Sequence, residues 1–138
     1  EQLLFLVDED TNAFNKIIDG FRMPKDTDLE KKIRLDAIED ATKYATEIPF
    51  KVMETSFKSM EVMQAMLRDG LKNSLSDAGV GVLCARAAVI GAYFNVRINA
   101  KDIKDRDFAT AILSKAVIIY EKTIAMEQET ISYIDSQM

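Results

Sequence analysis

The stretch SDAGVGVLCARAAVIGAYFNVRIN, residues 76–99, carries only three charged residues, in a chain that is otherwise rich in Lys, Glu and Asp. It is predicted to form one helix that contains Gly79, Gly81 and Gly91. Glycine within a helix costs about 1 kcal/mol relative to alanine, so these positions require a compensating interaction. We expect either the close approach of another helix, in this subunit or in a symmetry mate, or a flat ligand along the small side chains. Both explanations can apply at once if a groove forms between two helices.

One face of this predicted helix is small and is polar at both ends. At about 100° per residue, roughly a third of the circumference holds Asp77, Gly81, Cys84, Ala85, Ala88, Gly91, Ala92, Asn95 and Asn99. The opposite side is apolar, with Leu83, Ile90, Phe94 and Ile98, and it is flanked by Val82, Val89 and Val96. Asn95 and Asn99 are one turn apart and should act as a pair. Asp77 lies about 27 Å from Asn95 along the helix, so the two side chains cannot contact one reacting atom from the same helix. Either they bind opposite ends of a long ligand, or one of them has a structural role, or a second subunit that runs in the opposite direction brings its own copy close.

The composition indicates a single helical domain, residues 1–138, with a net charge of −5. We therefore expect no affinity for nucleic acid and no association with membranes, and no run of 18 apolar residues predicts a membrane span. The single cysteine, Cys84, excludes an internal disulfide. The absence of histidine excludes a Ser-His-Asp triad and a histidine metal site, and we expect no metal. Any acid or base must then be Asp, Glu, Lys, Tyr or Cys.

The rest of the chain also has helical periodicity, which predicts an all-α bundle of four to five long helices. A first helix is expected over 2–21, and a second from about 28, after a capping box of Thr27 and Glu30. Pro49 should kink or break the second helix, because proline lacks the backbone donor and restrains the residue before it. Helical periodicity then resumes as far as Gly70, and 72–76 reads as a loop. Asp105 is a plausible cap for a last helix from about 106.

Asp10 is a polar residue within an apolar pattern. It stands between Val7 and Phe14 on the stripe of the first predicted helix, which also contains Leu3, Ile17 and Phe21. A carboxylate buried there must be hydrogen-bonded or paired, and such groups are candidates for functional sites. A buried structural link to a neighbouring helix is an equally good interpretation.

Four segments resemble one family of folate enzymes. LVDEDTNAFN (6–15), RMPKD (22–26), NSLSDAGVGV (73–82) and above all GAYFNVRINAKDI (91–103) are similar to formiminotetrahydrofolate cyclodeaminases and methenyltetrahydrofolate cyclohydrolases. The resemblance spans most of the chain. It implies an all-helical homodimer whose motif positions are Asp10, Asp77, Asn95, Asn99 and Lys101. The family's glycine-rich segment of the type Pro-Gly-Gly-Gly-Ser does not occur in these 138 residues, so we expect this chain alone to lack full activity.

The resemblance implies conversion of 5-formiminotetrahydrofolate to 5,10-methenyltetrahydrofolate with release of ammonia, or alternatively hydrolysis of the methenyl bridge. Neither reaction needs a further cofactor, and the partners would be the folate substrate and a fused or separate formimidoyltransferase domain in the cytoplasm. Asp77 opens its helix, which favours its ionised form, whereas an apolar stripe favours a protonated Asp10. We expect Asp10 to donate a proton, Asp77 to be its ionised partner, and Asn95, Asn99 and Lys101 to bind substrate. A non-catalytic helical interaction module is the alternative from another class.

Overall fold

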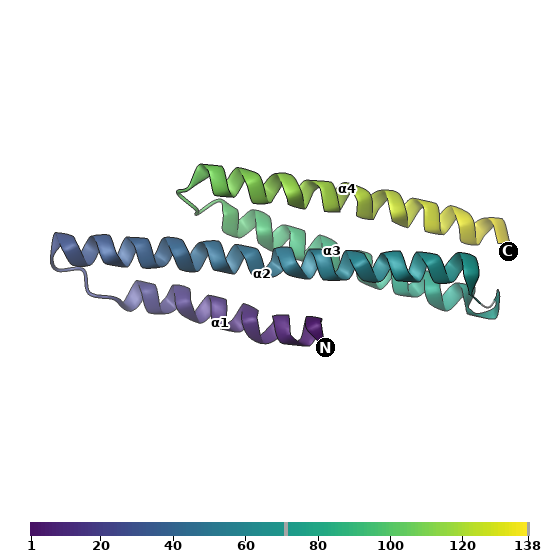
Figure 1. The fold of residues 1–138 in the computed structure, drawn as a ribbon, viewed down its shortest axis with the longest axis horizontal. Coiled ribbons are helices and arrows are strands. Elements are labelled where there is room, and N and C mark those ends of the chain that lie inside the picture. Colours follow the sequence, from purple (N-terminus) through teal and green to yellow (C-terminus); the bar gives the residue numbers. More distant parts are fainter. Residues whose placement is uncertain (71, 138) are drawn as a thin grey trace.

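The computed structural model describes residues 1–70 and 72–137, which form four long α-helices and a short 3₁₀ turn, with no strand among them. The elements are α1 (Gln2–Arg22), α2 (Asp28–Asp69), η1 (Lys72–Ser74), α3 (Leu75–Ala100) and α4 (Arg106–Gln137). Consecutive helices run in opposite directions (Figure 1). The predicted all-α bundle is confirmed, but the expected loop at 72–76 is wrong, because these residues form η1 and the start of α3.

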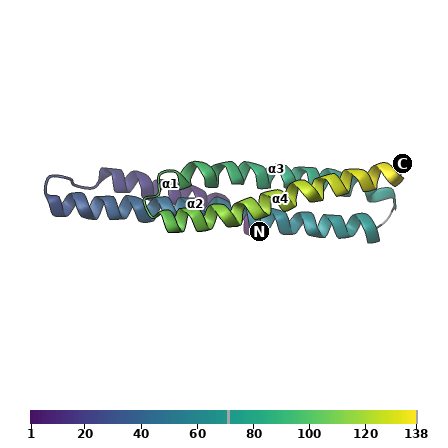
Figure 2. The same cartoon turned by 90° about the horizontal axis from the view of Figure 1, so that it is seen from above.

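The helices are staggered along the bundle axis. α1 lies beside the N-terminal half of α2, and the chain's N-terminus is near the middle of that long helix (Figure 1). The hairpin of α1 and α2 projects beyond the turn that joins α3 to α4, as the view from above also shows (Figure 2). α3 packs against both α2 and α4, so the main core of the bundle lies among α2, α3 and α4.

The core follows a seven-residue repeat, as in a left-handed bundle. α1 buries Leu6, Ala13 and Gly20, α2 buries Met53, Met60 and Leu67, and α3 buries Val82, Val89 and Val96. Each set points at a neighbouring helix, because residues seven apart lie on one side of a helix in such a bundle. The main core cluster joins the α2 and α3 sets to Ile112 and Ala116 of α4.

The buried face of α3 is the valine flank, and it includes only part of the small-residue face. Ala85 and Ala92 are buried, whereas Cys84, Ala88, Gly91 and Asn95 are exposed. Most of the opposite apolar side is exposed too, with Phe94 at 53% and Ile98 at 58%. α3 is apolar on nearly all sides, so its sequence alone does not select the face that packs.

The three glycines of α3 differ in their surroundings. A Cβ at Gly79 would collide with the Ile134 side chain of α4, and one at Gly81 would come within 2.7 Å of the Met63 sulfur of α2. The expected close approach of a neighbouring helix is therefore confirmed at these two positions. A Cβ at Gly91 would meet nothing within 4 Å, so α3 is open there.

By length and composition alone, α3 could cross a membrane, with a mean hydropathy of 1.5 in its 18-residue window. In the bundle it packs between α2 and α4 as a core helix.

The predicted break at Pro49 is wrong, because α2 runs without interruption from Asp28 to Asp69. Proline at this position cannot donate to the carbonyl of Ala45, four residues earlier. The side-chain amide of Asn99 on α3 donates to that carbonyl instead, at 2.8 Å. The hydrogen bond that the proline cannot make within its own helix is thus replaced by one from a neighbouring helix, and it ties α3 to α2.

We predict that Asn99→Ala lowers the free energy of unfolding by about 1–3 kcal/mol, because it leaves the backbone carbonyl of the buried residue Ala45 without a donor. Chemical denaturation measures this loss, and Asn95→Ala, at an exposed position one turn earlier, is the matched control. The loss should shrink in a Pro49→Ala background, where residue 49 can donate to Ala45. An equal loss in both backgrounds would contradict this pairing of Pro49 with Asn99.

Both predicted caps are confirmed. The backbone N–H of Glu30 donates to the Thr27 hydroxyl at 3.2 Å, and the N–H of Thr27 donates to the Glu30 carboxylate at 2.8 Å. The N–H of Phe108 donates to Asp105 at 3.1 Å, and Lys43 of α2 pairs with the same carboxylate at 2.7 Å. Lys43 and this N–H hold the pKa of Asp105 below its usual 3.8.

The Asp105 cluster should make stability depend on pH in the acid range. Because the folded pKa of Asp105 is lowered, its contribution is complete above the usual pKa of 3.8 and is lost as pH falls through the lower folded value. Asp105→Asn should therefore lower the unfolding midpoint most above about pH 5, and the difference from wild type should shrink towards pH 2. Thermal denaturation across this range tests it, with Asp102→Asn as the control. A difference that is constant with pH would contradict it.

Candidate functional site

A groove of about 470 Å³ lies where α1, α2 and α3 come together. α1 contributes Leu3, Leu6, Val7, Asp10 and Thr11, α2 contributes Pro49, Val52 and Ser56, and α3 contributes Ala88, Ala92 and Asn95. Its walls are largely apolar, and among the lining residues that the structure describes Asp10 alone is charged. The groove thus combines an apolar surface with a few polar groups, which is typical of a small-molecule site.

Two of the predicted site residues meet in this groove, and they come from different helices. Asp10 reaches it from α1 and Asn95 from the exposed part of the small face of α3. Ala92 and Ala88 lie about one and two turns before Asn95, and their small side chains leave the space open. The expectation that Asp10 is buried in an apolar stripe is wrong for this chain, because α1 packs through Leu6, Ala13 and Gly20 and leaves Asp10 exposed.

The residue before Asp10 holds α1 in place. The carboxylate of Glu9 accepts a hydrogen bond from the Tyr44 hydroxyl and another, at 3.2 Å, from the side-chain amide of Asn12. The Tyr44 hydrogen bond lowers the pKa of Glu9 below its usual 4.5 and raises that of Tyr44 above 10.0. Lys16 lies 4.0 Å over the Tyr44 ring. These contacts orient α1 on α2, with the neighbouring Asp10 at the groove.

The other predicted site residues lie elsewhere. Asp77 is exposed near the start of α3, in a separate pocket of about 580 Å³ with Met63 and Met66 of α2. The chain therefore does not bring Asp77 and Asp10 together as an acid–base pair. The side-chain amide of Asn99 is used for the Ala45 carbonyl, which is a structural role. Lys101 is exposed in the turn after α3, outside the described groove lining.

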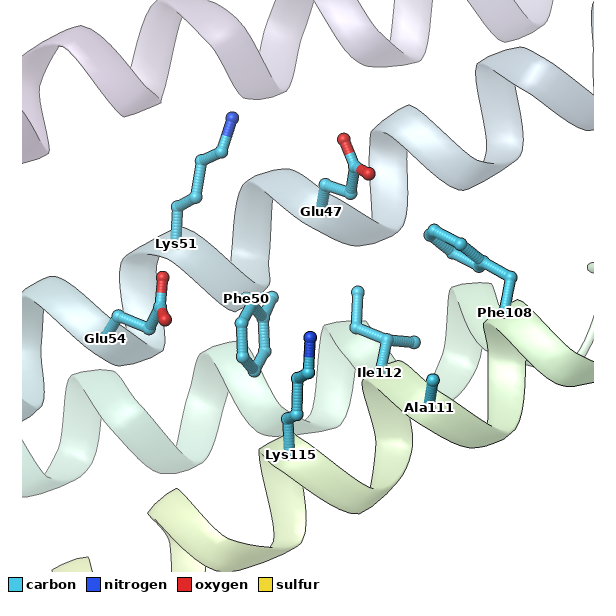
Figure 3. A pocket seen from close by; sticks show the side chains of 8 residues that line it. All are labelled: Glu47, Phe50, Lys51, Glu54, Phe108, Ala111, Ile112 and Lys115. Carbon is cyan, nitrogen blue, oxygen red and sulfur yellow. The ribbon is translucent and has the colours of Figure 1, made fainter.

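A further pocket, of about 360 Å³, lies between α2 and α4. Figure 3 shows Lys115 of α4 extending beside Phe50 of α2, with Glu47 and Glu54 on the α2 side. Phe108 and Ile112 form its apolar wall. Its described lining contains none of the predicted site residues, and its charges are of both signs. The α1–α2–α3 groove is thus the better candidate for a functional site.

Ser56 and Pro49 are among the groove residues that were not identified as site residues from the sequence. Ser56 is 1% exposed and occupies a core position of the seven-residue pattern of α2, between Met53 and Met60. A serine at such a position is an anomaly that the pattern reveals once the repeat is identified. The sequence suggested only that Pro49 breaks a helix, although Pro49 precedes Ser56 by seven residues and so lies on the same side of α2.

Comparison with known proteins agrees with the resemblance noted in the sequence. The profile of the family described as formiminotransferase-cyclodeaminase matches residues 1–117. A methenyltetrahydrofolate cyclohydrolase of Methylorubrum extorquens is 30% identical over 133 residues, which cover 96% of this chain and 64% of that protein. A formimidoyltransferase-cyclodeaminase of Gallus gallus is 34% identical over 110 residues, 80% of this chain and 20% of that protein.

The fold also has a solved counterpart. The crystal structure of formiminotetrahydrofolate cyclodeaminase from Thermotoga maritima superposes with a TM-score of 0.75 and 21% identity, over 98% of this chain and 61% of that one. At this identity the likeness concerns the fold. The chain thus spans less than two thirds of the length of these relatives. Because the family profile covers most of its residues, the chain belongs to the formiminotransferase-cyclodeaminase family.

Proposed function

We propose that the protein is a folate one-carbon enzyme that converts 5-formiminotetrahydrofolate to 5,10-methenyltetrahydrofolate and releases ammonia. The observation that carries this proposal is the groove of α1, α2 and α3, in which Asp10 and Asn95 face one apolar space. Family membership supports the substrate class. The non-catalytic interaction module is less favoured, because a helix that only packs has no use for this polar pair beside an open alanine wall.

The chemistry of the groove favours the pterin end of the folate. The reduced pterin is flat and uncharged and has several N–H donors, which a carboxylate and an amide can accept. The glutamate end is anionic, and the described lining of the groove contains no lysine or arginine. We therefore place the ring against Ala88 and Ala92, with its polar edge towards Asp10 and Asn95.

A single carboxylate can serve the proposed reaction. N10 attacks the formimino carbon, the N10 proton is lost, and the carbon–nitrogen bond to the departing nitrogen breaks. The formimino =N–H nitrogen leaves as ammonia after gaining two protons, one from N10 and one from the solvent, and the methenyl product carries the resulting positive charge. We propose that Asp10 accepts the proton from N10 and delivers it to the leaving nitrogen, so that Asp77 is not needed as a partner.

Methenyltetrahydrofolate cyclohydrolase is the second candidate activity. It is supported by the Methylorubrum extorquens relative of that name, whose match covers 96% of this chain. In that reaction water attacks the methenyl carbon and the bridge opens, and Asp10 would accept a proton from the water. The same groove can serve either reaction, because both have a bridging carbon between N5 and N10.

Ammonia release distinguishes the two reactions. The full-length protein that carries this chain is incubated with 5-formiminotetrahydrofolate, and ammonia and the absorbance of the methenyl product are followed together. We expect both to rise in parallel, and hydrolysis of 5,10-methenyltetrahydrofolate to be much slower. Rapid hydrolysis without ammonia release would favour the cyclohydrolase. Absence of both would contradict the proposed function.

We also propose that the protein acts as a homodimer, with a fused or separate formimidoyltransferase domain as a further partner. Phe14 and Phe21 are exposed on α1, seven residues apart and outside the described lining of the groove, and this spacing is typical of a helix that packs against another. The name of the chicken relative joins a formimidoyltransferase to a cyclodeaminase. A monomer in light scattering at high micromolar concentration would contradict the dimer.

A further inference from the structure

We propose that Ser56 is a specificity-determining residue whose hydroxyl forms a hydrogen bond with the bound folate ring at the floor of the groove. The proposal rests on the proposed function, because it assigns a further contact within the same site. It is carried by the burial of this side chain, by its lack of a hydrogen-bond partner and by its place in the groove.

Ser56 is the most deeply placed polar side chain of the groove. It is 1% exposed, whereas Asp10, Thr11 and Asn95 in the same lining are exposed. Its hydroxyl oxygen has no hydrogen-bond partner among the residues that the structure describes. A buried polar group without a partner is costly, and such groups are uncommon in native proteins.

Other hydroxyls of α2 show that a partner is within reach. Thr42, Thr46 and Ser59 each donate to the carbonyl four residues earlier, at 2.7, 2.8 and 3.1 Å. Ser56 is on the same helix, yet it makes no corresponding bond to Val52. Its hydroxyl is therefore available to a ligand that enters between α1 and α3.

The surroundings of Ser56 define what it can recognise. Leu6, Val52 and Ala92 line the groove with it and offer only apolar side-chain contacts. A neutral hydroxyl can both donate and accept, which suits the mixed donors and acceptors of a reduced pterin. A purely apolar ligand would leave the hydroxyl unsatisfied, so Ser56 selects against ligands that lack a polar edge.

The test measures stability and binding together in the full-length protein. Removing an unsatisfied buried hydroxyl should stabilise the free protein, so Ser56→Ala should raise the melting temperature by about 2–4 °C. The same change should weaken binding of 5-formyltetrahydrofolate, a stable analogue with oxygen in place of the imino nitrogen, by about tenfold. Ser56→Cys retains much of the size but bonds weakly, and it should weaken binding similarly. Ser59→Ala is the matched control and should leave binding unchanged.

The outcomes separate this inference from the proposed function. If wild type binds 5-formyltetrahydrofolate and Ser56→Ala binds it equally well, the role of Ser56 is overturned while the folate site stands. If Ser56→Ala is less stable than wild type, the hydroxyl has a structural role and the inference is also overturned. If wild type fails to bind the analogue and shows neither folate activity, the proposed function fails, and the inference fails with it.

Discussion

Replacing Asp10 with asparagine should lower the rate of ammonia release from 5-formiminotetrahydrofolate by about 10²–10⁴. Asparagine has nearly the same shape but can neither accept the N10 proton nor deliver it to the leaving nitrogen. Because Asp10 is exposed on α1, the change should leave the unfolding midpoint close to that of wild type. Steady-state kinetics of the full-length variant measure the loss, which should fall mainly on kcat.

Asp8→Asn is the matched control, since Asp8 is an exposed carboxylate two residues earlier on α1 and outside the described lining of the groove. Its rate should be close to that of wild type. Asp77→Asn provides a second comparison, because Asp77 lies in a different pocket. If Asp77→Asn loses the activity and Asp10→Asn keeps it, the proton transfer does not occur in the α1–α2–α3 groove.

Ala88→Leu should weaken binding of 5-formyltetrahydrofolate by about five- to 150-fold. The larger side chain would occupy the place of the ring, and overpacking typically costs about 1–3 kcal/mol, which corresponds to this range of affinity. The sequence had suggested that another helix packs on Ala88, in which case the protein itself would be destabilised. Ala88 is instead exposed at the groove, so the cost should fall on the complex.

Ala87→Leu is the control for this substitution. Ala87 is also exposed on α3 but lies outside the described lining of the groove. Calorimetric titration of both variants should show weak binding for Ala88→Leu and unchanged binding for Ala87→Leu. A large loss of thermal stability in Ala88→Leu would instead show that this face is covered in the assembled protein.

The fold could be predicted from periodicity and capping, and the failures have physical causes. Thr27 and Asp105 marked helix starts correctly because capping is a local interaction between residues three apart. The expected break at Pro49 is absent because the hydrogen bond that the proline cannot donate is replaced by one from Asn99, which is 50 residues away in the sequence. A tertiary hydrogen bond of this kind leaves no local pattern.

The candidate site was partly predictable. Asp10 and Asn95 were identified as polar residues in apolar or small surroundings, and they do meet. Their meeting depends on which faces of α1 and α3 pack. α1 packs through Leu6, Ala13 and Gly20 and exposes other apolar residues, such as Val7 and Phe14. Periodicity shows that an apolar face exists, but it does not say which of two faces lies against the neighbour.

The most direct measurement of the central claim is a crystal structure of the full-length protein with 5-formyltetrahydrofolate. We predict that the pterin ring lies between α1, α2 and α3, against Ala88 and Ala92, with Asp10 and Asn95 at its polar edge. A ring seated beside Asp77 and Met66, or in the pocket between α2 and α4, would contradict the assignment of the site.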